Sequence, residues 1–145
     1  MNAFDSFLMM LMNSHKNMQK LMNDCFAPLG LKCPAAICLR LINNCEGGIS
    51  ASGMSGMSGY DKALISRNCT ELKKLGLIAR NPEDCGIIRG YRLILTEKGD
   101  ALIRQMDEAI SNVTKTITNG IPQESLDIFY STAEKMADNI IGLSK

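Results

Sequence analysis

The chain of 145 residues has almost no excess of charge of either sign, since its 16 Lys and Arg and 15 Asp and Glu give a formal net charge of +1. The strongly basic composition that most simply indicates a nucleic-acid binder is therefore missing. The charge is nevertheless unevenly placed. Residues 60–98 hold eight basic and five acidic side chains, a net charge of +3, and the remainder has a net charge of −2. This distribution predicts a basic segment on a mildly acidic body.

The sequence also lacks the patterns of a zinc site or a disulfide framework. It has one histidine and no CxxC pair, so a Cys/His zinc site at ligand spacing is excluded, and no metal or other cofactor is expected. Several of the six cysteines stand where a helical pattern requires an apolar residue, which favours reduced, buried thiols. The cysteines are Cys25, Cys33, Cys38, Cys45, Cys69 and Cys85.

Catalytic and targeting signals are equally absent from the sequence. There is no Ser/His/Asp or Cys/His arrangement with assignable roles, and the glycine-rich stretch at residues 47–59 has no lysine-ending phosphate-loop pattern, so we do not expect an enzyme. The apolar N-terminus is interrupted by Asp5, Asn13, His15 and Lys16 and has neither a basic leader nor a small-residue cleavage site. We expect no signal peptide, no membrane partner and a cytoplasmic protein.

The stretch from Tyr60 to Ile78 predicts an amphipathic helix with one basic face. Asp61 suits the N-cap, and Gly76 can adopt the positive φ that ends a helix. The apolar positions expected to face inward are Ile65, Cys69, Leu72 and Leu75. The polar face carries Lys62, Ser66, Arg67, Thr70, Lys73 and Lys74. A helix of this kind resembles a DNA recognition helix.

Two short β-prone runs follow that helix, at Ile78–Asn81 and Gly90–Leu95, on either side of a turn containing Pro82, Asp84 and Gly86. They predict a β-hairpin, or wing. Thr96 then occupies the N-cap position of a further helix, with Glu97 in the first turn, where the helix dipole favours a negative charge.

Apolar residues at helical spacing predict helices at about residues 4–27, 34–45, 97–119 and 126–140, the third of which is the helix capped by Thr96. In the second, Ile37, Leu41, Ile42 and Cys45 are expected to face inward. Between residues 50 and 59 the sequence is ambiguous, because Gly53 and Gly56 each cost a helix about 1 kcal/mol relative to alanine. A flexible Gly/Ser loop remains open there, but a short helix capped by Ser50, with Met54 and Met57 facing inward, would support the helix that follows.

The ordered set of DKALISR at residues 61–67, LKKLGLI at 72–78, Arg89 and YRLILTEKG at 91–99 resembles the MarR family of winged helix-turn-helix regulators over nearly the whole chain. The resemblance implies a mainly α fold with a small β-hairpin wing, in which residues 31–96 form a DNA-binding head and residues 1–30 and 97–145 form dimerisation helices of one domain. The family's wing has an aspartate two residues before the arginine at Arg89, and this chain has Ile87 there. Asp84 or Glu83 could replace that aspartate. The candidate DNA contacts are Lys62, Ser66, Arg67, Thr70, Lys73, Arg80, Arg89 and Arg92.

The apolar seams of both terminal segments would be left uncovered in a monomer, so we expect a homodimer. Two recognition helices about one helical turn apart would then read a pseudo-palindromic operator in double-stranded DNA. The expected function is a transcriptional repressor released by a small-molecule effector, with His15 as a candidate effector contact. Two alternatives remain: a redox-sensing regulator that uses Cys25, and a dimeric helical interaction protein that has lost DNA binding.

Overall fold

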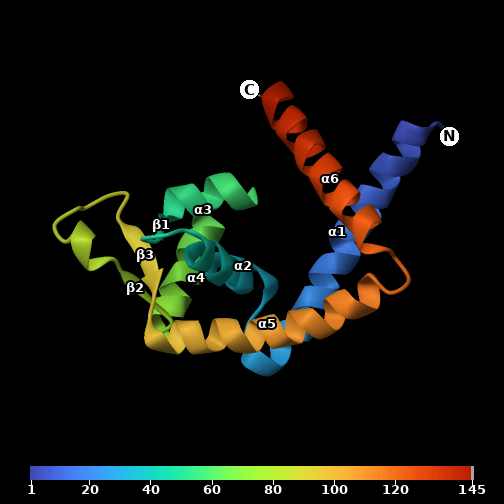
Figure 1. The fold of residues 1–145 in the computed structure, drawn as a ribbon. Coiled ribbons are helices and arrows are strands. Elements are labelled where there is room, and N and C mark those ends of the chain that lie inside the picture. Colours follow the sequence, from blue (N-terminus) through green and yellow to red (C-terminus); the bar gives the residue numbers. More distant parts are fainter. Residues whose placement is uncertain (145) are drawn as a thin grey trace. The chain divides into compact units, whose positions relative to one another are not determined.

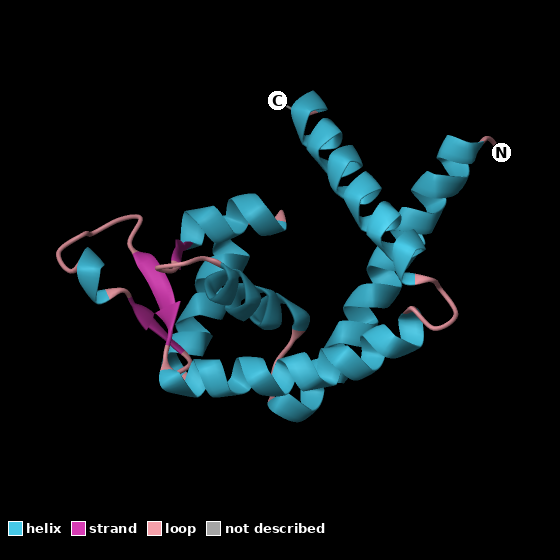
Figure 2. Cartoon of the chain, in the orientation of Figure 1, coloured by secondary structure: helices cyan, strands magenta, loops and turns pink. Residues whose placement is uncertain are grey.

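The computed structural model describes residues 1–144 and is mainly helical, with one small antiparallel sheet (Figure 1). Figure 2 shows how little of the chain is strand. The helices are α1 (Ala3–Phe26), α2 (Cys33–Asn44), α3 (Ala51–Ser58), α4 (Lys62–Lys74), α5 (Glu97–Ile117) and α6 (Gln123–Leu143). The strands are β1 (Ile49–Ser50), β2 (Ile78–Arg80) and β3 (Arg92–Leu95), and single 3-10 turns lie at Ala27–Leu29 and Pro82–Asp84. The predicted fold class is confirmed.

The chain divides into two compact units, one from Met1 to Ser111 and one from Asn112 onward. The first unit holds α1 to α4, the sheet and most of α5. The second holds the end of α5 and all of α6. No single helix within residues 1–144 is long and apolar enough to cross a membrane; only α1 and α2 taken together, across a bend of 81°, reach that length and composition.

The sheet has the order β1-β3-β2, and both pairings are antiparallel. Ile78 pairs with Leu95 and Arg80 with Leu93, which forms the predicted wing. The two-residue strand β1 adds to the other edge of β3 through Ile49 and Leu93. The expected hairpin is therefore a three-stranded sheet, and β1 fixes its position next to α3.

The core of the first unit lies between α2, α3, α4, β3, the end of α1 and the first half of α5. Its fully buried side chains come from every one of these elements, because each contributes one apolar face to a common centre. The largest are Phe26, Leu39, Met54, Ile65, Leu72, Leu93 and Met106. In α2 the buried face is Ala36, Cys38, Leu39 and Ile42, whereas Ile37, Leu41 and Cys45 are only half-buried, so the predicted inward face was rotated by part of a turn.

Side chains cap the predicted helix ends as expected. Asp61 accepts a hydrogen bond from the Leu64 N–H at 2.7 Å, and Thr96 accepts one from the Gly99 N–H at 3.1 Å. Gly76, with φ of 72°, follows the end of α4. The Thr96 hydroxyl also donates to the Gly76 carbonyl at 2.6 Å, which links the end of α4 to the start of α5.

The glycine-rich segment at residues 51–58 is helical, as favoured, and Ser50 caps it by accepting a hydrogen bond from the Gly53 N–H at 3.1 Å. Met54 is fully buried, but Met57 is 63% exposed, so the prediction of an inward Met54–Met57 pair was wrong. Leu75, predicted to face inward on α4, is 48% exposed for a related reason. Both residues lie at the last turn of a helix that ends at a glycine, where the core no longer extends under the helical stripe.

The two interior glycines of α3 should respond oppositely to alanine. A Cβ at Gly56 would meet nothing within 4 Å, so Gly56→Ala should raise the free energy of unfolding by about 0.5–1 kcal/mol through helix propensity alone. A Cβ at Gly53 would lie 2.8 Å from Ile49 Cγ1, and displacing that side chain should offset the gain. Urea titrations of both variants measure the difference, and a Gly56→Ala chain less stable than the parent would contradict the assignment.

Candidate nucleic-acid interface

The exposed face of α4 displays five of the eight predicted DNA contacts. Ile65, Cys69 and Leu72 are buried beneath it, so the side chains on the opposite side of the helix project into solvent. Arg67 stands in the second turn, and the α4 N-terminus is fixed by its Asp61 cap. The exposed residues of the predicted site on this helix are Lys62, Ser66, Arg67, Thr70 and Lys73.

Helix α3 packs against α4 through a turn made by serine side chains. The Ser55 hydroxyl donates to the Tyr60 carbonyl at 2.6 Å, and the Ser58 hydroxyl donates to the Met54 carbonyl at 2.7 Å while accepting from the Tyr60 N–H at 3.2 Å. Gly59, with φ of 74°, ends α3 between them. These contacts hold the two helices of a helix-turn-helix at a fixed angle, and they occupy the hydroxyls of Ser55 and Ser58.

Tyr91 gathers two of the predicted cationic residues beside α4. The Arg80 guanidinium lies 3.8 Å from the centre of the Tyr91 ring, within the range of a cation–π contact. The Lys73 ammonium lies 5.0 Å from the ring centre and donates to the Tyr91 hydroxyl at 3.0 Å. Lys73 from the last turn of α4 and Arg80 from β2 therefore share one platform. Tyr91 was not predicted as part of the site, although a tyrosine between Arg89 and Arg92, next to a strand, is a pattern that could have indicated it.

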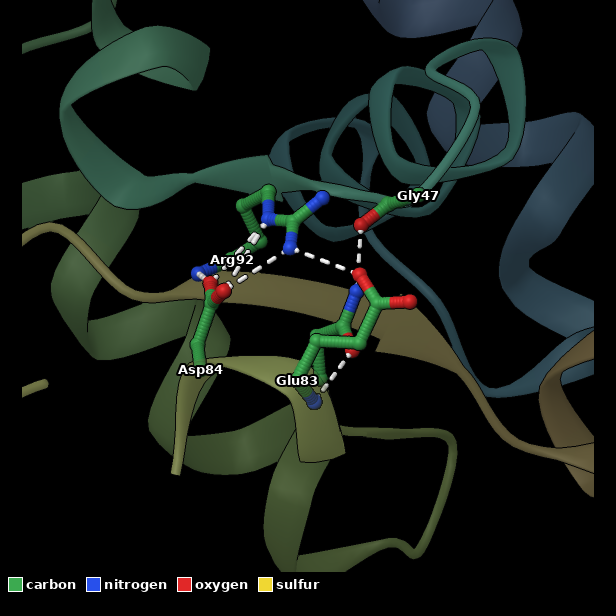
Figure 3. Close-up of polar contacts among 5 residues, drawn as sticks. Gly47, Glu83, Asp84 and Arg92 are labelled. Carbon is green, nitrogen blue, oxygen red and sulfur yellow. Dashed lines mark hydrogen bonds and ion pairs between the residues drawn. The ribbon is translucent and has the colours of Figure 1, made fainter. Parts of the chain in front are cut away.

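Arg92 is bound to acidic residues of the wing. Its Nε and NH2 donate to the Asp84 carboxylate at 3.1 and 2.8 Å, its backbone N–H donates to the same group at 2.6 Å, and NH2 reaches Glu83 at 3.0 Å (Figure 3). Half-buried Arg92 and buried Asp84 thus close the base of the hairpin. The contact of Arg92 with a phosphate stays a prediction, and the pairing of its guanidinium with two carboxylates disfavours it.

The same pairing corrects the expectation for the missing wing aspartate. Asp84 and Glu83 do not hold Arg89, since both contact Arg92 instead. Arg89 is exposed and makes no side-chain hydrogen bond or ion pair to residues 1–144. Ile87, in place of the family's aspartate, contributes its backbone carbonyl, which accepts a hydrogen bond from Arg80 NH2 at 2.6 Å.

Asn81 joins this wing base to the loop before β1. Its side-chain amide donates to the Gly47 carbonyl at 2.8 Å, and its side-chain oxygen caps the 3-10 turn by accepting from the Glu83 N–H at 2.9 Å. A Cβ at Gly47 would lie 2.9 Å from Arg92 NH1, so the glycine permits the close approach. The base of the wing is therefore held rigidly by these contacts, whereas the loop beyond it forms no strand pairing.

Acid should weaken the pairing of Asp84 with Arg92 at the base of the wing. Hydrogen bonds from the Arg92 side chain and backbone hold the pKa of Asp84 below its usual value. Because this pKa is lower in the folded than in the unfolded chain, ionised Asp84 stabilises the fold. The stabilisation is complete above the unfolded-state pKa of about 3.9 and is lost as the pH falls through the folded-state pKa. The urea midpoint of Asp84→Asn should therefore lie below that of the parent by a constant amount above about pH 5, and the gap should close in more acidic solution.

A matched control for that measurement is Glu108→Gln. Glu108 is an exposed carboxylate of α5 with no hydrogen bond or ion pair to another described residue. Its replacement should leave the urea midpoint near that of the parent from about pH 7 downward. A gap for Asp84→Asn that stays the same between about pH 5 and pH 2 would contradict the coupling between Asp84 and Arg92.

A mostly apolar cavity of about 390 Å³ lies between α1, α2 and α5 within the first unit. Met18, Met22 and Ile37 contribute apolar surface, and His15, Arg40 and Tyr60 contribute polar groups to its lining. Arg40 forms an ion pair with Asp107 of α5, which anchors the guanidinium at the cavity. His15, predicted from sequence as an effector contact, is thus placed in a cavity wall.

The six cysteines are all unpaired thiols, as predicted. Cys33, Cys38 and Cys69 are buried, Cys25 and Cys45 are half-buried, and Cys85 is exposed in the wing loop. A hydrogen bond with the Cys69 thiol, together with burial, raises the pKa of Cys38. Cys25 packs against the edge of the core.

The chain thus contains a helix-turn-helix that is followed by a hairpin and flanked in sequence by long helices. No model of a known protein family matches the sequence. The chain superposes on a MarR-family regulator from Rhodococcus sp. RHA1 with a TM-score of 0.82 and 20% identity, over 94% of this chain and 95% of that one. The fold is that of the MarR family of transcriptional regulators. A MarR/EmrR-family regulator from Acinetobacter sp. ADP1 gives a TM-score of 0.83 at 16% identity, over 98% and 99%.

CouR from Rhodococcus jostii RHA1, solved with p-coumaroyl-CoA bound, shares the MarR fold with a TM-score of 0.78 and 22% identity, over 94% of this chain and 96% of CouR. Within the MarR fold, α3 and α4 form the helix-turn-helix, and β2 and β3 form the wing beside it. Of the predicted contacts, Lys73 and Arg80 lie together on the Tyr91 ring. Arg67 and Arg89 are exposed, whereas Arg92 is paired with Asp84 at the base of the wing.

Proposed function

We propose that this protein is a homodimeric, sequence-specific regulator of transcription that binds double-stranded DNA through α4 and the wing and acts as a repressor. The exposed basic side of α4 carries the proposal, because Lys62 and Arg67 stand in the first two turns of the helix, the part that reaches base edges in helix-turn-helix proteins. Its fold is shared with transcriptional regulators of the MarR family.

The pairing of acidic residues strengthens the positive field of this face. Asp61 caps α4, and Glu71 lies 3.3 Å from Lys74 on the same helix. Glu83 and Asp84 both pair with Arg92. The cations left without an acidic partner within residues 1–144 include Lys62, Arg67, Lys73, Arg80 and Arg89. A phosphate backbone would therefore meet positive charge from both α4 and the wing, although the whole chain is close to neutral.

Exposed apolar side chains support the proposed dimer. Within the first unit, α1 exposes Phe4, Leu8 and Leu11, which are four and three residues apart and form the apolar seam of that helix, and α6 of the second unit exposes Phe129 and Ile140 of its own seam. A single chain gains little by leaving such residues in water, and a second copy of the same chain would cover them. Two heads joined in this way would read the two halves of a pseudo-palindromic operator.

The cavity between α1, α2 and α5 is the proposed effector site. Its size and apolar lining suit a small molecule with an aromatic or aliphatic body, and His15 supplies a polar group that such a molecule could contact. A ligand there would contact helices of the proposed dimer region and of the head at once, so it could shift the spacing of the two heads. By linkage, an effector that weakens operator binding by some factor must bind the DNA complex more weakly by the same factor.

The deciding experiment is fluorescence anisotropy with duplexes that tile the region upstream of the protein's own gene. We expect one duplex to bind at least about 10³-fold more tightly than a scrambled one, with affinity that falls steeply as salt rises. Equal or absent binding to all duplexes would favour the alternative of an interaction protein without DNA reading. The redox alternative predicts that peroxide abolishes binding, that dithiothreitol restores it and that Cys25→Ser removes the response.

A further inference from the structure

The loop at the tip of the wing carries an unusual apolar pair. Ile88 is 86% exposed and Ile87 is 43% exposed. Among the large apolar side chains of residues 1–144, only Met1 and Leu143, next to the ends of the chain, are more exposed than Ile88. Figure 1 shows this loop projecting from the sheet at the end away from the start of α5. An apolar pair exposed in this way at a loop tip is available for contact with a partner.

The loop is held from both sides at Ile87. The Ile87 N–H donates to the Asp84 carbonyl at 3.1 Å, and the Ile87 carbonyl accepts from Arg80 NH2 at 2.6 Å. Gly86 and Gly90, with φ of 89° and 75°, make the bends on each side of the tip. Ile88 is therefore presented outward by a braced loop, and a partner would pay little conformational entropy to use it.

The charges around the tip favour one kind of partner. Arg80 and Arg89 lie on either side of the isoleucine pair in the sequence, and the acidic residues of the preceding turn are already paired with Arg92. A positively charged apolar tip is suited to a polyanion with an apolar interior. Stacked bases between two phosphate backbones have that combination, and minor-groove proteins insert Ile, Leu, Phe or Met side chains between base steps.

We propose that Ile88 is a wedge that enters the minor groove beside each half-site, partly unstacks one base step and bends the duplex, while Arg89 and Arg80 contact the adjacent phosphates. The inference rests on the proposed DNA-binding function and adds to it a mode of DNA deformation. It also gives sequence preference to positions that no side chain reads directly, because pyrimidine–purine steps unstack most easily.

The test uses the full-length protein at saturating concentration on its tightest-binding duplex, with 2-aminopurine placed in turn at each step flanking the half-sites and with donor and acceptor dyes at the duplex ends. The parent protein should raise 2-aminopurine fluorescence at one step on each side and bend the duplex by about 20–90°. Ile88→Ala should abolish both signals at equal occupancy, and Ile88→Leu should retain them. Arg89→Ala should retain the unstacking while binding more weakly.

The outcomes separate the two levels of the proposal. Tight, specific binding without any unstacking or bend would overturn the wedge and leave the regulator intact, as would a bend that Ile88→Ala does not change. Absence of specific binding to every duplex would overturn both. Loss of self-association in Ile88→Ala, measured by sedimentation, would show that the tip contacts a second copy of the chain and would equally overturn the wedge.

Discussion

A chain carrying Leu11→Asp and Phe129→Asp should be a monomer and should lose on the order of 10²–10⁴-fold in operator affinity. Both side chains lie on the predicted seams and are exposed in the single chain, Phe129 to 57%. A carboxylate in an apolar dimer interface would be buried without a partner, which is strongly unfavourable. In a monomer each head binds its half-site independently. The second head then no longer benefits from the high effective concentration that the dimer gives it next to the other half-site.

The matched control is Ser131→Asp, which adds the same charge to α6 on the side opposite the seam. Ser131 is exposed and donates only to the Ile128 carbonyl of its own helix, at 3.1 Å. Its variant should remain dimeric and bind DNA like the parent. Sedimentation should give the mass of one 15.9 kDa chain for the double variant. A monomeric double variant with full operator affinity would refute the link between dimerisation and DNA reading.

Much of the fold could be predicted because its helices carry continuous apolar stripes and distinct caps. The ends of α4 and the start of α5 follow from Asp61, Gly76 and Thr96, whose local chemistry requires no knowledge of the tertiary fold. Even the glycine-rich α3 was indicated by its Ser50 cap. The exposure of Met57 and Leu75 at the last turns of α3 and α4 was not predictable in the same way. Both residues continue the apolar stripe of their helix, but the core does not extend beneath them.

Strand β1 shows a second limit. Two residues, Ile49 and Ser50, have no alternation to detect, and their pairing with β3 depends on a partner more than forty residues away. Contacts across the wing were equally hidden. Arg92 could have projected to either face of its strand, and only the 3-10 turn at Pro82–Asp84 brings the Asp84 carboxylate to it. The basic residues of α4 were easier, because helical periodicity alone separates them from the core.

The sharpest test of the interface compares Arg67→Ala with Arg89→Ala. Arg67 is exposed on the side of α4 opposite the buried Cys69, in the turn expected to meet base edges. Its loss should cost roughly 1–3 kcal/mol per half-site on the cognate operator and much less on random DNA. Two half-sites double the loss if each contributes independently.

Arg89 should behave differently, because it stands on the wing loop, where the expected contact is the sugar–phosphate backbone. Arg89→Ala should weaken cognate and scrambled duplexes alike, and the slope of log affinity against log salt should flatten by about 0.9 for each arginine removed. Since Asp84 and Glu83 pair with Arg92, no acidic side chain within residues 1–144 orients Arg89. Holding its contact then costs side-chain entropy, which should reduce the affinity change without altering its sign.

Fluorescence anisotropy on cognate and scrambled duplexes across a salt series distinguishes the two roles in one data set. Arg67→Ala should keep the parent's salt slope on the operator and reduce the ratio between the two duplexes, whereas Arg89→Ala should keep the ratio and reduce the slope. Equal weakening on both duplexes with a flattened slope for Arg67→Ala would mean that Arg67 holds a phosphate. Base reading would then have to come from Lys62 and Ser66, the other exposed residues in the first two turns of α4.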